Sequence, residues 1–214
     1  MPIERFDGAN DLSFIRTTYL DTPDLHSYRE YLERRPVRTK VRVRQYGANG
    51  QVNGVCWVEI KVKKQQMTAK RRFRCTRQAL LDLIDGRDVR EDVANANPGK
   101  PAAMEIFEAA RELILKGRLR PVVRVDYQRL AFQHPTQPES RITLDREIRY
   151  RAATGPRRAG HDGIVLEAKH ADLEPQWLSD FLRALTLEKS SRFSKFARAV
   201  QALGVNGSPG KEPA

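Results

Sequence analysis

Charged and apolar residues alternate at a spacing of two in several segments of the chain, and this alternation constrains the fold more than any other feature. In the segment KVRVR, every second residue is a cation and the residues between are valines. Side chains on a strand point to its two faces in turn, so Lys40, Arg42 and Arg44 share one face. The segment therefore predicts a strand with one cationic and one apolar face.

The same pattern recurs in five later segments. VEIKVK and KRRFR place charged residues at alternate positions, and VVRVDY, RITLD and VLEAK add carboxylates to the cations. The charged positions are Glu59, Lys61, Lys63, Lys70, Arg72, Arg74, Arg124, Asp126, Arg141, Asp145, Glu167 and Lys169. Short connections between such strands predict an antiparallel sheet with a charged face.

The expected elements alternate between strands and short amphipathic helices. Strands are expected over residues 14–20, 38–46, 55–64, 68–75, 121–133, 141–150 and 163–170. Helices are expected over residues 22–35, 77–85, 102–116 and 175–203, the last with a break near 189–191. Thr22 and Thr76 are the expected N-caps of the first two helices. The fold class is α+β, with helices packed outside the sheet.

The overall charge favours a polyanionic partner. The 214 residues contain 39 lysines and arginines against 27 aspartates and glutamates, a net charge of +12. The length predicts one domain over residues 1–203, followed by a disordered tail over 204–214. No run of about 18 apolar residues occurs, so no membrane-spanning helix is expected and the predicted location is cytoplasmic. Cys56 and Cys75 are interpreted as buried free thiols.

A face crowded with like charges needs an anion to offset their repulsion. Polyphosphate fits, because arginine offers two parallel hydrogen bonds to phosphate oxygens and lysine adds a compact charge. A carboxylate on that face can bind Mg²⁺ or Mn²⁺ held against the same oxygens. If the sheet closes into a barrel with its charged face inward, the result is a basic tunnel.

Eight segments together resemble the VTC domain of polyphosphate polymerases, within the triphosphate tunnel metalloenzyme superfamily. Each is weak alone, but their order and spacing match the family across residues 17–202. The segments are TTYLDTPDLHSYREYL, KVRVRQYG, VEIKVK, KRRFR, RVDYQRLAFQ, RITLDREIRY, VLEAKH and RFSKF.

The resemblance implies an antiparallel β-barrel tunnel that binds ATP and a growing polyphosphate chain. The γ-phosphoryl group of ATP would pass to that chain with Mn²⁺ or Mg²⁺. The candidate catalytic residues are Lys40, Arg42, Arg44, Lys61, Arg124, Arg141 and Lys195. The candidate substrate-binding residues are Lys63, Lys70, Arg72, Arg74, Arg129, Lys169 and Arg192, and the candidate metal ligands are Glu167 and Glu59. Asp126 and Asp145 are expected to orient arginines through salt bridges, with metal contact as the alternative.

One departure from the family pattern concerns the first strand. The family opens with a charged strand well upstream of the TPDL segment, whereas only sixteen residues precede Thr17 and they show no such alternation. One wall of the barrel is therefore expected to be absent, supplied by a partner chain, or lost through a truncated or misassigned start of the sequence.

Two other functions stay open at this point. A triphosphate hydrolase of the same superfamily would use the same tunnel with water as acceptor, although the ExExK strand typical of that branch is not found. A binding module for polyphosphate or nucleic acid would need no turnover. Nucleic acid is disfavoured because aromatic residues are not interleaved with the cations. The sequence also has no P-loop and no HExxH motif.

Overall fold

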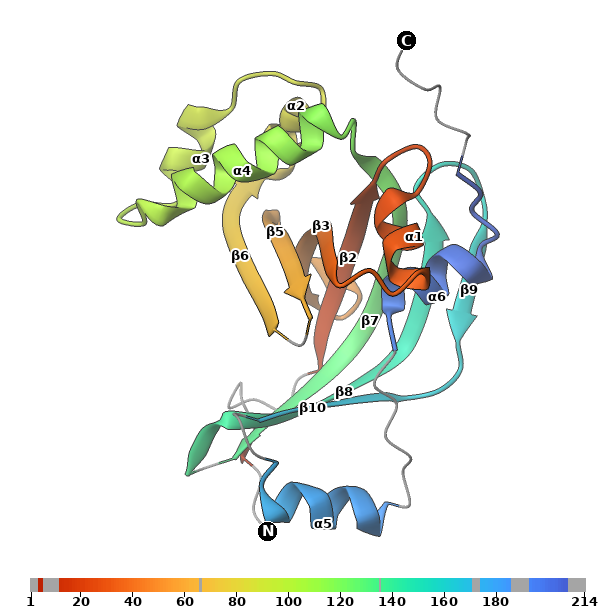
Figure 1. The fold of residues 1–214 in the computed structure, drawn as a ribbon. Helices are drawn as coiled ribbons and strands as arrows, with labels where there is room; N and C mark the ends of the chain where they lie inside the picture. Colours follow the sequence, from red (N-terminus) through yellow and green to blue (C-terminus); the bar gives the residue numbers. More distant parts are fainter. Residues whose placement is uncertain are drawn as a thin grey trace.

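The computed structural model describes residues 4–5, 12–65, 67–134, 136–170, 174–185 and 193–207, with the backbone alone for residues 4, 5 and 138. Within these residues the chain forms one ten-stranded sheet and six helices (Figure 1). The strands are β1 Glu4–Arg5, β2 Ser13–Asp21, β3 Val37–Ala48, β4 Gln51–Val52, β5 Val55–Lys64, β6 Met67–Thr76, β7 Arg120–His134, β8 Gln137–Ala152, β9 Arg158–His161 and β10 Val165–Lys169. The helices are α1 His26–Leu32, α2 Arg77–Ile84, α3 Arg90–Ala96, α4 Ala102–Lys116, α5 Gln176–Ala184 and α6 Lys195–Ala202.

The seven predicted strands are all present, and the α+β antiparallel prediction is confirmed. The hydrogen-bonded path runs β10-β8-β7-β2-β3-β5-β6, and the short strands β1, β4 and β9 pair with β7, β3 and β8. In the described part of the chain, β6 and β10 have no partner on their outer edges. The predicted barrel is therefore not closed by these strands. The two residues of β1 lie against β7, not in the opening between β6 and β10.

The open sheet nevertheless curls around its charged face. Lys61 on β5 interacts electrostatically with Glu167 and Lys169 on β10. These strands are five positions apart in the sheet, which would separate them by about 24 Å if the sheet were flat. Figure 1 shows β7, β8 and β10 bending round below β5 and β6. The two ends of the sheet thus enclose a concave space lined by the charged face.

Two apolar cores hold the sheet in this shape. The outer core packs α2, α3 and α4 against β3, β5 and β6 through residues that include Val41, Val58, Phe73 and Phe107. The inner core lies on the concave side and packs α6 against β2, β7 and β8. It contains Tyr19, Val125, Tyr127, Tyr150, Phe196 and Val200.

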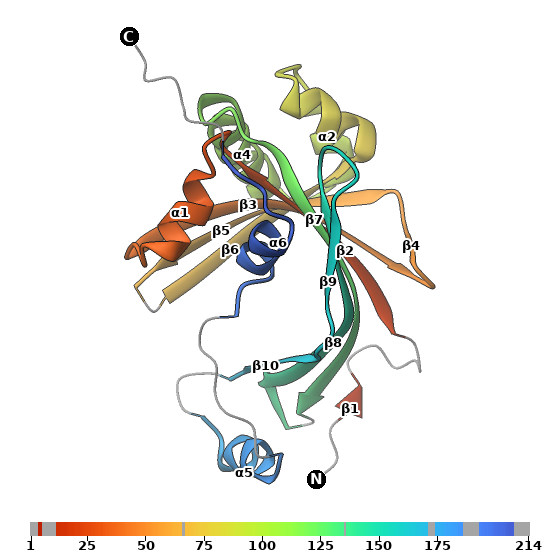
Figure 2. The same cartoon turned by 90° about the vertical axis from the view of Figure 1, so that its right-hand side faces the viewer.

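The position of α6 corrects the expectation that the helices pack outside. That expectation holds for α2, α3 and α4, but α6 covers part of the concave face itself (Figure 2). Phe196 stacks on Tyr19 with ring centroids 4.9 Å apart. The helix can lie there because Val123, Val125 and Tyr127 present an apolar stretch on the inner side of β7.

The first helix begins later than predicted because a carboxylate at the end of β2 takes over the capping. Asp21 accepts hydrogen bonds from the backbone N–H groups of Ser27 and Tyr28 at 2.9 and 3.0 Å. Thr22 Oγ1 accepts from the N–H of His26 at 2.8 Å. Residues 22–25 therefore form a turn, and α1 starts at His26. In contrast, Thr76 caps α2 as predicted.

The C-terminal helical segment is divided as expected, into α5 and α6, and the predicted break at 189–191 lies outside the described residues. The short α3 was not predicted; Asn97 fixes its end to β6 through hydrogen bonds with both backbone groups of Arg74. In the predicted tail, the carbonyl of Gly204 accepts a hydrogen bond from Arg157 at 2.6 Å, and residues 208–214 are not described. None of the described helices has the length and apolar character to cross a bilayer.

The packing of the outer core predicts that substitutions at two valines on the same side of β3 have different effects on stability. Val41 is 2% exposed, so Val41→Asp should abolish cooperative unfolding by placing an unpaired carboxylate in the outer core. Val37 is 48% exposed on the same strand face and is the matched control, because Val37→Asp leaves its carboxylate in water. Urea titration followed by circular dichroism tests both. A cooperative transition in Val41→Asp would contradict the packing described here.

Candidate functional site

Strand register gathers the predicted cations of β3, β5 and β6 on the concave face. Three rows cross these strands: Lys40 pairs with Lys61 and Lys61 with Lys70, and the other rows run Arg42, Glu59, Arg72 and Arg44, Trp57, Arg74. Lys63 follows Lys61 on the same face. The alternation in the sequence therefore predicted this part of the surface correctly.

A buried carboxylate lies at the centre of these rows. Glu59 is fully buried and accepts a hydrogen bond from Arg42 Nε at 2.7 Å. Its other oxygen is 3.2 Å from Lys70 Nζ and 3.8 Å from Arg72 Nη1. Burial alone would raise the pKa of Glu59, but the cations outweigh it and lower the pKa. The carboxylate is thus occupied by three cations and is not open to a metal ion.

A second buried carboxylate joins β7, β8 and α6. Asp145 is fully buried and receives two parallel hydrogen bonds from Arg129, at 2.6 and 2.8 Å. Its Oδ2 atom also lies 2.5 Å from Lys195 Nζ. Lys195 is the first residue of α6, so the predicted approach of this lysine from a helix start is confirmed. Asp145 orients two cations, as expected from the salt-bridge interpretation.

Lys40 lies between the sheet and α6. Its Nζ donates a hydrogen bond to Ser194 Oγ at 3.3 Å and lies 4.9 Å from the ring centroid of Tyr31 and 5.3 Å from that of Phe196. Burial, with the nearby charge of Lys61, lowers the pKa of Lys40 to about 8. This lysine is therefore a cation near neutral pH and loses its proton at mildly alkaline pH.

Glu167 is the more open carboxylate on the face. Its side chain is 45% exposed, 3.2 Å from Lys169 Nζ and 3.9 Å from Arg129 Nη2. Burial would raise the pKa of Glu167, but the charges of Lys169 and Arg129 outweigh it and lower the pKa to about 2. The carboxylate is ionised at any physiological pH.

The carboxylates of the concave face fit a metal ion in only one way, which is together with phosphate groups of a substrate. Among the described residues, no three histidine, cysteine or acidic side chains converge to form a cage. Mg²⁺ and Mn²⁺ are commonly held by one or two carboxylates together with substrate phosphates and water. Glu167 fits that mode, whereas Glu59 does not because its oxygens face cations.

Several cations on the face have no carboxylate partner. Lys61, Lys63 and Arg141 make no ion pair with any described residue, and Arg141 is exposed beside Lys169 in the register. Burial and the charge of Arg42 lower the pKa of Lys61, which indicates a cation in surplus. Such groups are free to bind a multiply charged anion.

Arg124 does not lie where the sequence predicted, because its side chain is on the face opposite the concave face. It pairs with Thr18 on β2, which in turn pairs with Val43 on the outer, apolar side of β3. The concave side of β7 at this level carries Val123 and Val125, which contact α6. The prediction that Arg124 binds substrate in the tunnel is therefore wrong. Arg192 lies outside the described residues.

Trp57 is a neighbour of the predicted site residues that sequence reasoning missed. Trp57 lies on the charged face, with the Arg72 guanidinium 4.2 Å and that of Arg74 5.6 Å from its ring centroid. Its spacing of two from Glu59 was the available signal. Ser194 stands directly before Lys195 in RFSKF, a position typical of a helix N-cap, and it caps α6 and accepts the hydrogen bond from Lys40.

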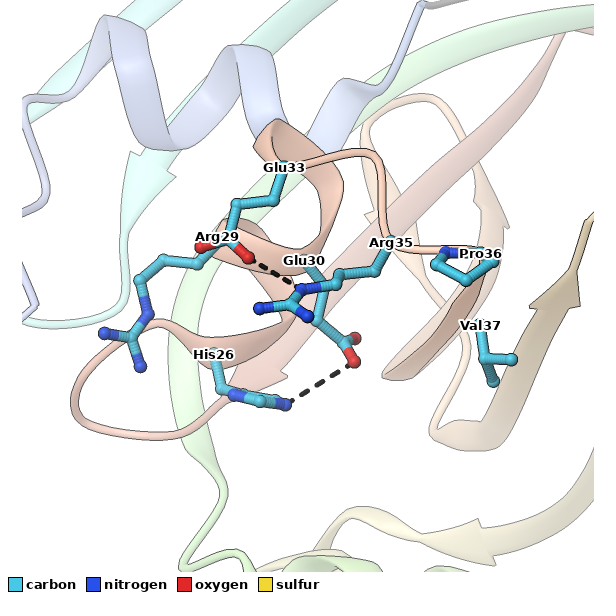
Figure 3. Close-up of a pocket in the computed structure, with 7 residues that line it drawn as sticks. All are labelled: His26, Arg29, Glu30, Glu33, Arg35, Pro36 and Val37. Carbon is cyan, nitrogen blue, oxygen red and sulfur yellow. Dashed lines mark hydrogen bonds and ion pairs between the residues drawn. The ribbon is translucent and has the colours of Figure 1, made fainter.

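A separate hollow of about 650 Å³ lies beside α1 (Figure 3). It is lined by His26, Arg29, Glu30, Glu33, Arg35, Pro36 and Val37. Cations and carboxylates there are matched, as in the contact between Arg35 and Glu33 at 2.8 Å. None of the predicted site residues lines it, so it is distinct from the charged face.

Fold and face together define an antiparallel α+β domain built around a cationic concave surface. The family model for the VTC domain matches residues 1–204, so this chain belongs to the VTC domain family. The predicted resemblance is thereby confirmed.

Relatives and a solved structure agree with this placement. Vacuolar transporter chaperone complex subunit 4 of Schizosaccharomyces pombe is 26% identical over 91% of this chain and 32% of its own length. The subunit of the same description from Trypanosoma brucei brucei is 23% identical over 88% of this chain and 28% of its own. The chain thus spans about a third of these relatives. A Bacillus halodurans structure described as a candidate adenylate cyclase has the same fold, with a TM-score of 0.53, 13% identity and coverage of 90% of this chain and 84% of its own.

The network around Asp145 predicts the effect of removing its charge. Asp145→Asn should lower the free energy of unfolding by about 3 kcal/mol, because Arg129 and Lys195 lose the carboxylate that they share. Saturating tripolyphosphate should restore part of that loss by supplying negative charge. Glu112→Gln, at an exposed ion pair with Lys116, is the control and should change little. Equal effects of the two substitutions in urea titrations would argue against a buried network.

The low pKa of Lys40 predicts how anion binding responds to pH. Binding an anion favours the charged amine, so tripolyphosphate affinity should be flat below about pH 7.5 and decline as pH rises through 8. Lys40→Arg keeps its charge in this range, so the ratio of parent to variant affinity isolates the lysine. Calorimetric titration from pH 7 to 9.5 measures it. A constant ratio would contradict the assignment of Lys40 to the anion-binding face.

Proposed function

We propose that this domain is a polyphosphate polymerase, which transfers the γ-phosphoryl group of ATP to a growing polyphosphate chain on the concave face. The observation that carries the proposal is the surplus of cations there: Lys61, Lys63 and Arg141 have no carboxylate partner in the described chain. Membership of the VTC domain family supports the same conclusion. Consumption of ATP is in keeping with the predicted cytoplasmic location.

The chemistry asks for positioning and charge neutralisation more than for a protein nucleophile. Arg42 and Arg129 are held in place by Glu59 and Asp145, so both guanidinium groups are fixed on the concave face before a substrate binds. Pre-oriented donors of this kind stabilise charge that develops on phosphate oxygens. Lys40 and Lys195 add positive charge from the side of α6.

Glu167 is the proposed ligand for Mn²⁺ or Mg²⁺. A bound divalent ion would neutralise phosphate oxygens and help to orient them. The neighbouring Lys169 and Arg129 keep the Glu167 carboxylate ionised, so it is ready to bind a cation at neutral pH. Lys70, Arg72, Arg74 and Lys169 are proposed to bind the parts of the phosphate chain farther from the reacting group.

The opening between β6 and β10 is proposed to be covered by a partner chain. Strand edges leave backbone N–H and C=O groups unpaired, and such edges readily accept another strand. Covering that opening would complete the tunnel that the sequence predicts. The open edges also favour a second candidate function, a module that binds polyphosphate without turnover.

Phosphorus NMR of ATP incubated with the protein and Mn²⁺ separates these functions. Internal chain phosphates are expected from the parent, whereas orthophosphate alone would show a hydrolase and unchanged ATP with retained tripolyphosphate binding would show a binding module. Glu167→Gln should keep most of the tripolyphosphate binding and lose the turnover of ATP.

Lys61→Ala should lower tripolyphosphate affinity by at least about tenfold without unfolding the protein. Arg71→Ala, which removes an exposed cation from the outer face of β6, is the control; equal effects of Arg71→Ala and Lys61→Ala would overturn the proposal.

A further inference from the structure

Six arginines gather on the outer face of β2, β7, β8 and β9, opposite the concave face. Register places them there: Arg124 pairs with Arg151 and Arg151 with Arg158, while Asp126 pairs with Arg16 on one side and Arg149 on the other. We call this patch the outer arginine surface; its members are Arg16, Arg124, Arg146, Arg149, Arg151 and Arg158.

The negative charge on this surface is too small to balance it. Asp126 receives two hydrogen bonds from Arg16, at 3.0 and 3.2 Å, and lies 3.4 Å from Arg124 Nε. Glu147 is 3.9 Å from Arg146 Nε and 4.0 Å from Arg149 Nη2, at the limit of an ion pair. Arg151 and Arg158 have no carboxylate partner within the described ranges. Two carboxylates therefore face six arginines.

The unbalanced cations repel one another across the sheet. Arg124, Arg151 and Arg158 are direct partners on three adjacent strands, about 4.8 Å apart at the backbone. Like charges in that position destabilise a sheet. Burial, with the charges of Arg16, Arg151 and Arg158, lowers the pKa of Arg124. An anion laid across these strands would relieve the repulsion.

The outer arginine surface is accessible over most of its extent. The side chains of Arg149 and Arg146 are 70% and 47% exposed, and Arg158 is also exposed. Helices α2, α3 and α4 pack against β5 and β6, and α6 packs on the concave side. In Figure 2 the labelled helix beyond the lower ends of β7 and β8 is α5, whose Trp177 contacts His134 and Gln137, residues that do not belong to the outer arginine surface.

We propose that the outer arginine surface is a second anion-binding site, which takes a linear chain of phosphates independently of the concave face. The choice of ligand rests on the proposed function, because polyphosphate would be the product made on the other side of the sheet. Four adjacent strands carry arginines over a width of about 14 Å, which a single phosphate cannot span. A chain of linked phosphates presents an oxyanion to each strand in turn, and arginine binds phosphate oxygens through two parallel hydrogen bonds.

The surface fits phosphate better than protein or nucleic acid. Protein interfaces depend on buried aromatic and apolar anchors, and single strands are bound by exposed rings on which bases stack. The described ring next to these arginines, Phe14, is already covered by the Arg16 guanidinium, 5.7 Å from its centroid. Charge without an aromatic platform favours the inorganic polyanion.

The test compares two ligands on three variants of the full chain. The outer double substitution Arg151→Gln/Arg158→Gln removes two cations that have no ion pair. Lys61→Ala weakens anion binding on the concave face. The control, Lys64→Ala/Arg71→Ala, removes two cations elsewhere on the outer face. Calorimetry at several salt concentrations measures affinity for tripolyphosphate and for inorganic polyphosphate much longer than the surface. The outer double variant should lose long-chain affinity at least about tenfold, with a salt dependence lower by about two ions, and keep its tripolyphosphate affinity.

Each other outcome would overturn the inference. Unchanged long-chain affinity in the outer double variant would do so, as would an equal loss in Lys64→Ala/Arg71→Ala. Duplex DNA and anionic vesicles are titrated as comparison ligands, and a loss confined to either of them would assign the surface to another partner. Loss of folding is controlled by thermal unfolding, where relief of repulsion should leave the outer double variant at least as stable as the parent. The proposed function is tested separately, since its failure shows in Lys61→Ala and in the NMR spectrum.

Discussion

Repulsion between like charges is the constraint on which the concave face depends. Glu59 and Asp145 are fully buried, and each is surrounded by cations from different elements. Glu59 connects β3, β5 and β6, while Asp145 connects β7, β8 and α6. Two carboxylates thus let the sheet bring many cations together and at the same time leave enough of them unpaired to hold an anion. Removing either carboxylate would leave the repulsion between the cations around it unopposed. Buried cations without a partner lower the stability of the folded protein.

Alternation predicted which residues share a face of a strand, and this was sufficient for β3, β5 and β6. It could not predict which face of each strand turns inward, because that depends on register and on what covers the sheet. On β7 the apolar side turns inward, since α6 packs against Val125 and Tyr127. Arg124 was therefore misplaced, whereas Arg129, an odd number of residues away, lies inside. That odd spacing already showed that the two arginines could not share one face of a regular strand.

A bulge in β8 explains how the same strand serves both surfaces. Register shifts by one residue opposite Asp126 and Gln128, and Glu147 has a positive φ of 51°. Before the bulge, Asp145 points to the concave face; after it, Ile148 and Tyr150 take that side and Arg149 and Arg151 point outward. Extra residues of this kind have no strong signal in a single sequence, so the outer arginine surface was not predicted.

The position of Ser194 and Lys195 has a consequence for synthesis of the chain. Both residues follow every strand of the sheet in the sequence, yet Lys195 contacts Asp145 on β8 and Ser194 contacts Lys40 on β3. During translation the whole sheet emerges from the ribosome before the residues that complete its cationic face. In a nascent chain whose α6 is still inside the ribosome, Asp145 can pair only with Arg129. The apolar side of β7 is then not yet covered by α6. Full anion affinity therefore requires that α6 has been made and has packed against the sheet.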